Sequence, residues 1–453
     1  MFSLLNNTIR WYIVIGVFLY VILFAYYGND CISWYNALNI YMFASYALIL
    51  WKSNKLADAN FTSKNLGIIV FAYSFVFVTL SLLLSDYYSD NSFIFSDSDA
   101  IAYYKYSSAL LGKSHEKWIP FLLDKRWFYD DWGAPIAYTL MFHIVHSKLF
   151  VNFCYVLLNT ISSICLFKIG RVIMHVRYAY IAALSFAISS YSIFFMGSFL
   201  KEEMLVFLVV ASMYMLYMYI QHNNMGYLFI GGFISLAVIF FRPPVALFIW
   251  VSYMIFFLLK AKKGIFRSLA IFVTILAAVA AFGIIQFSAE RYAHSGDVTE
   301  TEVFVSTSAF QKIVLYAGAL VGPFPQLLQY DDNFTYKPLF GAGLLFKLLL
   351  PLAFWTGFWK SVRHKYTAVI PLYAFVILEI LGLSVALDGL ELRKSMPHVP
   401  LYILTAFWLL SMNDMDMEKG GTSHSHDIWV TRQFAIVVCV AFGAALVWNI
   451  WKQ

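Results

Sequence analysis

Apolar runs long enough to cross a membrane recur along the whole chain, separated by short polar or charged segments. A transmembrane helix needs about 20 consecutive, mostly apolar residues. Counted between the charged interruptions, these runs predict about thirteen transmembrane helices. The expected spans are 10–27, 33–51, 65–84, 149–168, 177–197, 203–220, 226–241, 244–260, 265–287, 342–358, 367–387, 398–411 and 434–450. Segment 134–147 is apolar but short, and we expect a re-entrant or juxtamembrane helix there.

Lysine and arginine in the short loops predict the orientation of these spans. With the N-terminus in the cytoplasm, every short basic loop falls on the cytoplasmic side, as the positive-inside rule requires. The long segments 85–148 and 288–341 and the turn 388–397 then lie on the other side of the membrane. This orientation places nearly all the unusual polar residues on the non-cytoplasmic face.

The composition supports the same fold class, an all-α polytopic integral membrane protein. The 453 residues are 61% hydrophobic and 12% charged, whereas soluble domains are about half apolar and a quarter charged. The four cysteines are scattered, which is typical of small core residues and not of a disulfide or metal framework. The net charge of +6 is spread over the loops. No basic block suited to nucleic acid is present, and we expect no nucleic-acid partner.

The stretch FSDSDAIAYYKYSSALLGK predicts an amphipathic helix over 97–112, at the edge of the membrane. Asp99, Tyr103 and Ser107 follow the four-residue steps of one helical face. Asp97 lies where it can cap the N-terminus of the helix. Two interpretations stay open from this pattern alone. The aspartates either cap and solubilise the helix, or one of them acts on a ligand at the membrane surface.

Four later segments carry polar residues or proline at the expected external ends of spans. They are WGAPIAYTLMFHIVHSKLFVNFCYVLLNTI (132–161), GSFLKEEMLVFLV (197–209), VIFFRPPVALF (238–248) and ELRKSMPHVPLYILTAF (391–407). Together with the D-x-x-x-Y-x-x-x-small spacing that begins at Asp99, they resemble, in order, the polar loops of GT-C glycosyltransferases. This superfamily includes the dolichyl-phosphate-mannose and aminoarabinose transferases and bacterial enzymes of cell-envelope synthesis. The likeness is strongest from about 85 to 260, and the juxtamembrane helix keeps only Pro135 of the family's proline pair.

The resemblance implies a membrane enzyme that moves a sugar from a polyprenyl phosphate or diphosphate to a glycan or lipid acceptor. The reaction is expected at the periplasmic face of a bacterial inner membrane. The attacking hydroxyl must lose a proton, which requires a carboxylate within hydrogen-bond reach. The departing phosphate gains negative charge, which requires preorganised cations. No resident metal or cofactor is expected, although a diphosphate donor would add a divalent cation.

The matching positions imply three groups of site residues. Asp99 is the expected general base, with Asp97 as the alternative. The expected acceptor-binding residues are Asp130, Asp131, Glu202 and Tyr103, and the expected donor-phosphate ligands are Lys201, Arg242, Arg393, Lys394 and His398. A charge at the end of a span also serves as an interfacial anchor, and the aspartates before the juxtamembrane helix also suit a helix cap.

The resemblance divides the chain into five regions: N-terminal helices (1–84), an external catalytic loop (85–148), a GT-C-like core (149–287), an external loop or lid (288–341) and C-terminal helices (342–453). Two other functions remain open. An O-antigen or capsule polymerase would join lipid-linked repeat units and depend more on arginines in external loops. A lipid or sugar transporter would use charges inside the spans, which are few, and an internal repeat, which we do not find.

Overall fold

The computed structural model describes residues 3–27, 34–88, 98–124, 132–260, 349–385 and 393–418. Within these ranges the chain forms 15 α-helices and two short 3-10 helices, without a strand. The expected all-α fold is therefore confirmed for the described part of the chain. The count of about thirteen spans is not confirmed, and the expected spans 265–287 and 434–450 lie outside the described residues.

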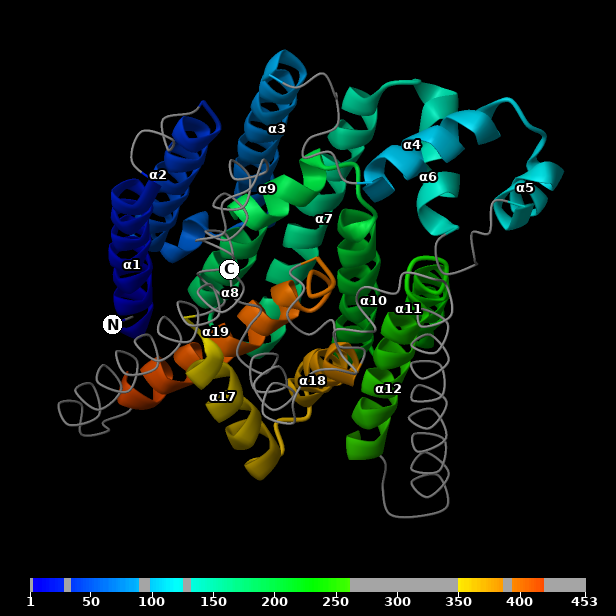
Figure 1. The fold of residues 1–453 in the computed structure, drawn as a ribbon. Helices are drawn as coiled ribbons and strands as arrows, with labels where there is room; N and C mark the ends of the chain where they lie inside the picture. Colours follow the sequence, from blue (N-terminus) through cyan, green and yellow to red (C-terminus); the bar gives the residue numbers. More distant parts are fainter. Residues whose placement is uncertain are drawn as a thin grey trace, which may run out of the picture.

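The described helices lie mostly on the apolar runs of the sequence. Figure 1 shows how they are arranged in space. Their bounds are α1 (Ser3–Tyr27), α2 (Trp34–Asn54), α3 (Ser63–Tyr88), α4 (Ser98–Leu111), α5 (Trp118–Asp124), α6 (Gly133–Ile144), α7 (Lys148–Ile173), α8 (Val176–Ala187), α9 (Ser190–Gly197), α10 (Glu202–His222), α11 (Met225–Val238), α12 (Pro243–Lys260), α17 (Pro351–Arg363), α18 (Ile370–Val385) and α19 (Val399–Glu418), with 3-10 helices at Asp58–Asn60 and His115–Lys117.

Four helices are long and apolar enough to cross a membrane: Ser63–Leu84, Lys148–Ile173, Glu202–His222 and Pro243–Lys260. The α8–α9 pair makes a fifth span if it is counted as one, but it is bent by 45°. The bend arises at Ser189, whose backbone is extended and whose hydroxyl accepts a hydrogen bond from the Ser192 amide. This N-cap starts a new helix where one continuous span was expected at 177–197. The protein therefore has the helices of an integral membrane protein.

Helix α7 packs against α3, α8 and α10 in the middle of the bundle. The Asn159 side chain on α7 donates to the Ala187 carbonyl at the end of α8, at 2.8 Å, and to the Ser74 hydroxyl on α3, at 3.3 Å. Because a membrane interior provides no water to pair a freed carbonyl, this asparagine satisfies the backbone at the α8–α9 bend. The same residue joins three helices around the centre of the fold.

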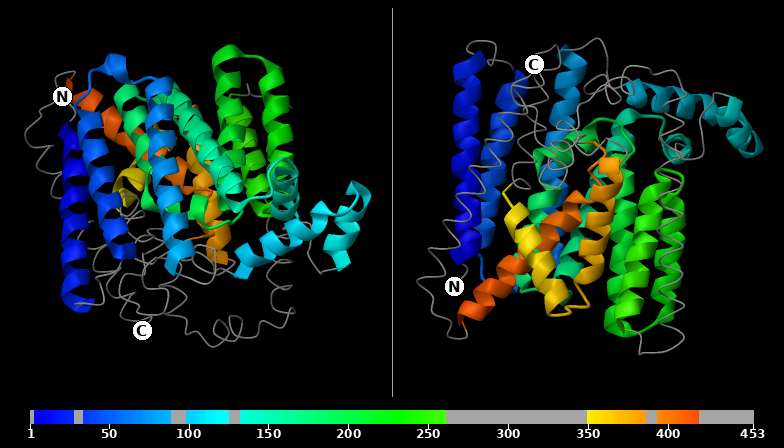
Figure 2. Two further views of the ribbon diagram at one scale, coloured as in Figure 1. Left: turned by 90° about the horizontal axis from the view of Figure 1, so that it is seen from above. Right: turned by 60° about the horizontal axis from the view of Figure 1, so that its bottom comes forward.

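Helices α4, α5 and α6 gather at one side of the bundle, away from α1 and α2, and α5 extends beyond the other helices (Figure 2). Helix α4 packs against α6. The helix expected at 97–112 and the short helix expected at 134–147 are both confirmed. Their contact brings the start of α4 close to the elements that carry the later polar motifs.

Gly133 holds the start of α6 against the turn between α11 and α12. Its amide donates to the Phe240 carbonyl at 2.8 Å. A Cβ atom at this position would lie 2.6 Å from the Phe241 ring and 2.8 Å from the Phe240 carbonyl oxygen. Since the carbonyl belongs to the backbone, it cannot move aside as a flexible side chain would.

We expect Gly133→Ala to lower the unfolding free energy by about 1–3 kcal/mol, because the new methyl group forces α6 away from this turn. Thermal unfolding of the detergent-purified variants measures the effect. Gly232→Ala is the matched control, since its Cβ would meet nothing within 4 Å. Equal melting temperatures for the two variants would contradict the close contact.

Candidate active site

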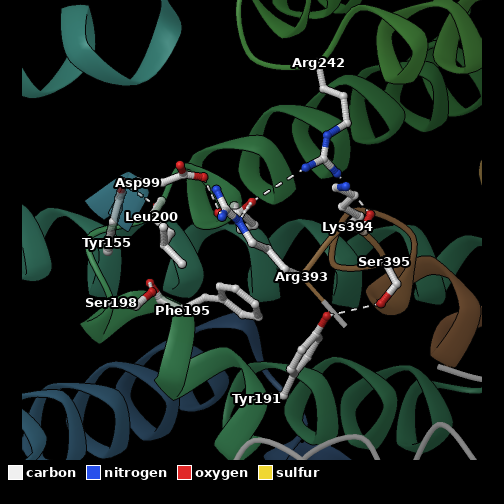
Figure 3. Close-up of polar contacts among 11 residues, drawn as sticks. Asp99, Tyr155, Tyr191, Phe195, Ser198, Leu200, Arg242, Arg393, Lys394 and Ser395 are labelled. Carbon is white, nitrogen blue, oxygen red and sulfur yellow. Dashed lines mark hydrogen bonds and ion pairs between the residues drawn. The ribbon is translucent and has the colours of Figure 1, made fainter. Parts of the chain in front are cut away.

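Five charged residues from four separate parts of the chain lie together where α4, α10, α12 and α19 begin. Figure 3 labels four of them, Asp99, Arg242, Arg393 and Lys394. We refer to them as the Asp99–Arg393 cluster. Its members are Asp99, Glu202, Arg242, Arg393 and Lys394.

Glu202 is the buried centre of the cluster, with 0% of its side chain exposed. Its Oε1 atom accepts a hydrogen bond from Arg393 Nε at 2.7 Å and lies 3.6 Å from Arg242 Nη2. Glu202 is also the first residue of α10, where the helix dipole favours a carboxylate. One buried carboxylate thus fixes two guanidinium groups side by side.

Arg393 connects this buried carboxylate to one that faces solvent. Its Nη1 atom lies 2.7 Å from Asp99 Oδ2, and the Asp99 side chain is 50% exposed. Asp99 is in the first turn of α4, on the arm at the side of the bundle. The Arg393 guanidinium therefore connects the buried carboxylate of Glu202 to the accessible carboxylate of Asp99.

Arg242 belongs to the turn just before α12 and is held there by the backbone of a second turn. Its Nη1 atom donates to the Lys394 carbonyl at 3.0 Å. Two prolines begin α12 at Pro243, and a residue that precedes proline is disfavoured in helical geometry. The Arg-Pro-Pro sequence therefore ends the turn at Arg242.

The turn 198–201 that leads into Glu202 is shaped by buried aromatic residues. Phe199 has a left-handed backbone with φ 58°, which is strained for a bulky residue, and its ring centroid lies 4.3 Å from that of Tyr138. The Tyr155 hydroxyl donates to the Leu200 carbonyl at 2.9 Å and accepts from the Tyr138 hydroxyl. Burial raises the pKa of the Tyr138 phenol, so it stays protonated and keeps this hydrogen bond.

Two more charged residues flank Glu202 in the sequence. Lys201 is largely buried and interacts electrostatically with the Glu202 carboxylate. Glu203 is fully buried, and neither of its carboxyl oxygens has a hydrogen-bond partner among the described residues. The expected donor ligand Lys201 therefore lies next to the cluster.

Two expected site residues are buried in the core. The Tyr103 side chain packs with its ring centroid 6.2 Å from that of Tyr138. His398 has its Nδ1 atom 3.6 Å from the Glu379 carboxylate, and both side chains are 2% exposed. The expected residues Asp97, Asp130 and Asp131 and the expected lid at 288–341 lie outside the described residues.

The tyrosines that support the site could not be selected from the sequence. Tyr138, Tyr155 and Tyr191, whose hydroxyl lies 3.3 Å from the Ser395 hydroxyl, are three of 31 tyrosines in the chain, and a tyrosine near the end of an apolar run also suits a membrane interface. Glu379 had a clearer signal, because it is a charged residue within an apolar run. Among the residues that the structure describes, no group of three or more His, Cys, Asp or Glu side chains is placed to hold a metal ion.

No protein-family model matches this sequence, and no curated protein is significantly similar to it. The residues of the cluster and the order of the motifs along the chain are the features that indicate a function.

The cluster combines two guanidinium groups with two carboxylates, and one of these carboxylates is accessible. Paired arginines suit a phosphate oxygen pattern, because guanidinium groups donate two parallel hydrogen bonds. The exposed carboxylate suits proton transfer from a hydroxyl. The arrangement can therefore bind a phosphate group and remove a proton within one site.

Proposed function

We propose that this protein is a membrane glycosyltransferase of the GT-C type. It transfers a sugar from a polyprenyl phosphate or diphosphate to a glycan or lipid acceptor, at the periplasmic face of a bacterial inner membrane. The observation that carries the proposal is the bridge made by Arg393, 2.7 Å from both the exposed Asp99 and the buried Glu202. The order of the polar motifs along the chain supports the same assignment.

Asp99 is the general base in the proposed reaction. The acceptor hydroxyl gives its proton to the Asp99 carboxylate as its oxygen bonds to the anomeric carbon. The bond between that carbon and the phosphate oxygen breaks, and the polyprenyl phosphate leaves with the electron pair. Asp99 suits this role because its side chain is half exposed and lies beside the cations that would hold the donor.

Arg242 and Arg393 stabilise the leaving phosphate, with Lys201 and Lys394 adding positive charge nearby. Preorganised cations act most strongly where charge develops in the transition state. Glu202 keeps both guanidinium groups in place before the donor arrives, since its buried carboxylate contacts each of them. It thereby supports phosphate binding without direct contact with the sugar.

We expect Arg242→Ala to lower sugar transfer by about 10²–10³-fold, because one preorganised donor to the phosphate is lost. The assay uses protein in liposomes with a panel of polyprenyl phosphate-linked and polyprenyl diphosphate-linked labelled sugars. The released lipid phosphate and the glycosylated acceptor are both quantified. Arg363→Ala is the matched control, since Arg363 is an exposed arginine at the end of α17.

The same assay separates the competing functions. Products that grow by whole repeat units from a diphosphate donor would identify a polymerase, which the paired arginines also favour because a diphosphate carries more negative charge. Labelled lipid that changes leaflet with its sugar–phosphate bond intact would identify a transporter. Either outcome would overturn the single-sugar transferase.

A further inference from the structure

Glu379 and His398 form a buried ionisable pair outside the Asp99–Arg393 cluster. Glu379 belongs to the apolar helix α18, and its Oε2 atom lies 3.6 Å from His398 Nδ1. Both side chains are almost fully buried. A carboxylate in such surroundings is costly unless it is paired, so its presence requires a reason.

His398 closes the turn that begins at Arg393. Hydrogen bonds run along this turn from the Met396 amide to the Arg393 carbonyl, at 3.2 Å, and from the His398 amide to the Ser395 carbonyl, at 3.3 Å. The Tyr402 amide then donates to the His398 carbonyl at 2.8 Å, in the first turn of α19. The turn and the start of α19 therefore form one hydrogen-bonded unit.

Side chains fix this unit from several directions. The Ser395 hydroxyl lies 3.3 Å from the Tyr191 hydroxyl on α9, and the Lys394 carbonyl accepts from Arg242. At one end of the unit Arg393 reaches Asp99 and Glu202, and at the other end His398 meets Glu379. A shift of His398 along α18 would therefore displace Arg393 from its two carboxylates.

We propose that Glu379 is a positioning residue. It acts through His398 to hold Arg393 in the position in which its guanidinium group binds the donor phosphate. The role in catalysis rests on the proposed function. Buried ion pairs often contribute little to stability compared with apolar residues of similar volume, and they are best known for fixing register. A second role for the pair would be to carry the proton away from Asp99 after the reaction. That role is not needed, because the Asp99 side chain is half exposed and can release its proton to solvent.

The first test compares Glu379→Met and Glu379→Gln in the liposome assay, with the donor concentration varied. We expect Glu379→Met to fold and to lose about 10²-fold in kcat/KM for the donor, since a displacement near 1 Å at a reacting centre has an effect of about this size. The loss falls mainly on kcat, because Arg393 acts on the charge that develops on the leaving phosphate. Glu379→Gln recovers most of it, because the amide keeps the shape of the carboxylate 3.6 Å from His398. Ile380→Met is the matched control, a residue equally buried on the same helix.

Unchanged kcat/KM in folded Glu379→Met would overturn the proposal. So would a loss that follows the melting temperature alone, or a loss that Ile380→Met reproduces.

The second test needs no substrate. Thermal unfolding is measured for Arg393→Ala in the wild-type and Glu379→Met backgrounds, as a double-mutant cycle. If Glu379 places Arg393, the drop in melting temperature caused by Arg393→Ala becomes smaller once Glu379 is gone. Additive drops would overturn the positioning role. If the two drops in melting temperature are coupled but the protein consumes no lipid-linked sugar, the proposed function is refuted. The inference that Glu379 positions Arg393 would then still stand.

Discussion

Asp99→Asn is expected to lower sugar transfer by about 10²–10⁴-fold, the usual contribution of a positioned general base. The amide has nearly the shape of the carboxylate and can still contact Arg393, but it cannot take the proton of the acceptor hydroxyl. Turnover of the lipid-linked donor in liposomes measures the change. Donor affinity should vary much less than turnover, because the arginines and Glu202 remain in place.

The fold should tolerate this substitution. Asp99 is 50% exposed, and an exposed ion pair contributes no more than about 1 kcal/mol. The melting temperature of Asp99→Asn should therefore stay close to that of the wild type. Asp124→Asn, on the same arm at the end of α5, is the matched control and should retain full turnover. Unchanged turnover in correctly inserted Asp99→Asn would remove Asp99 from the mechanism.

Arg393→Ala is expected to impair both transfer and folding. It removes the hydrogen bond at 2.7 Å to Glu202, whose fully buried carboxylate would keep Arg242, at 3.6 Å, and the electrostatic interaction with Lys201. Breaking a buried ion pair by removing one partner lowers stability by about 3–5 kcal/mol. Arg393→Lys should recover part of the stability without the activity, since one ammonium cannot replace a planar guanidinium that contacts two carboxylates.

A double variant separates the two effects of this residue. Glu202→Gln in the Arg393→Ala background removes a buried carboxylate charge that has lost its closest partner, so the melting temperature should rise towards that of the wild type. Transfer should stay low, because the ligand of the phosphate is still missing. If the double variant recovered transfer along with stability, Arg393 would have a structural role alone.

The apolar pattern predicted where helices lie more accurately than how they are divided. Helices α4 and α6 match their expected segments within a few residues, because a short amphipathic or apolar run between polar segments allows few alternatives. The run at 177–197 was expected to be one span. Its division depends on the Ser189 cap, and a serine inside an apolar run is a weak signal for a helix boundary.

The candidate site was partly predictable for a related reason. The lysines and arginines of the short loops predict that four residues lie on the same side of the membrane: Asp99, Glu202, Arg242 and Arg393. Their proximity is consistent with that expected orientation. Which of them pair could not be predicted, since Asp99 and Arg393 lie far apart in the sequence and meet only through packing. His398 lies five positions after Arg393, and only the path of the turn directs one outward and the other towards Glu379.

Because Arg393 contacts both Asp99 and Glu202, it affects the order in which the donor and the acceptor bind. The positive charge of Arg393 is already balanced by the two carboxylates of Asp99 and Glu202, and the solvent-facing contact is the weaker of the two. On the proposed mechanism, an incoming lipid phosphate would displace Asp99 from Arg393 and leave that carboxylate unoccupied for the acceptor. The base would then become available only after the donor is bound, which predicts ordered binding, with the donor before the acceptor.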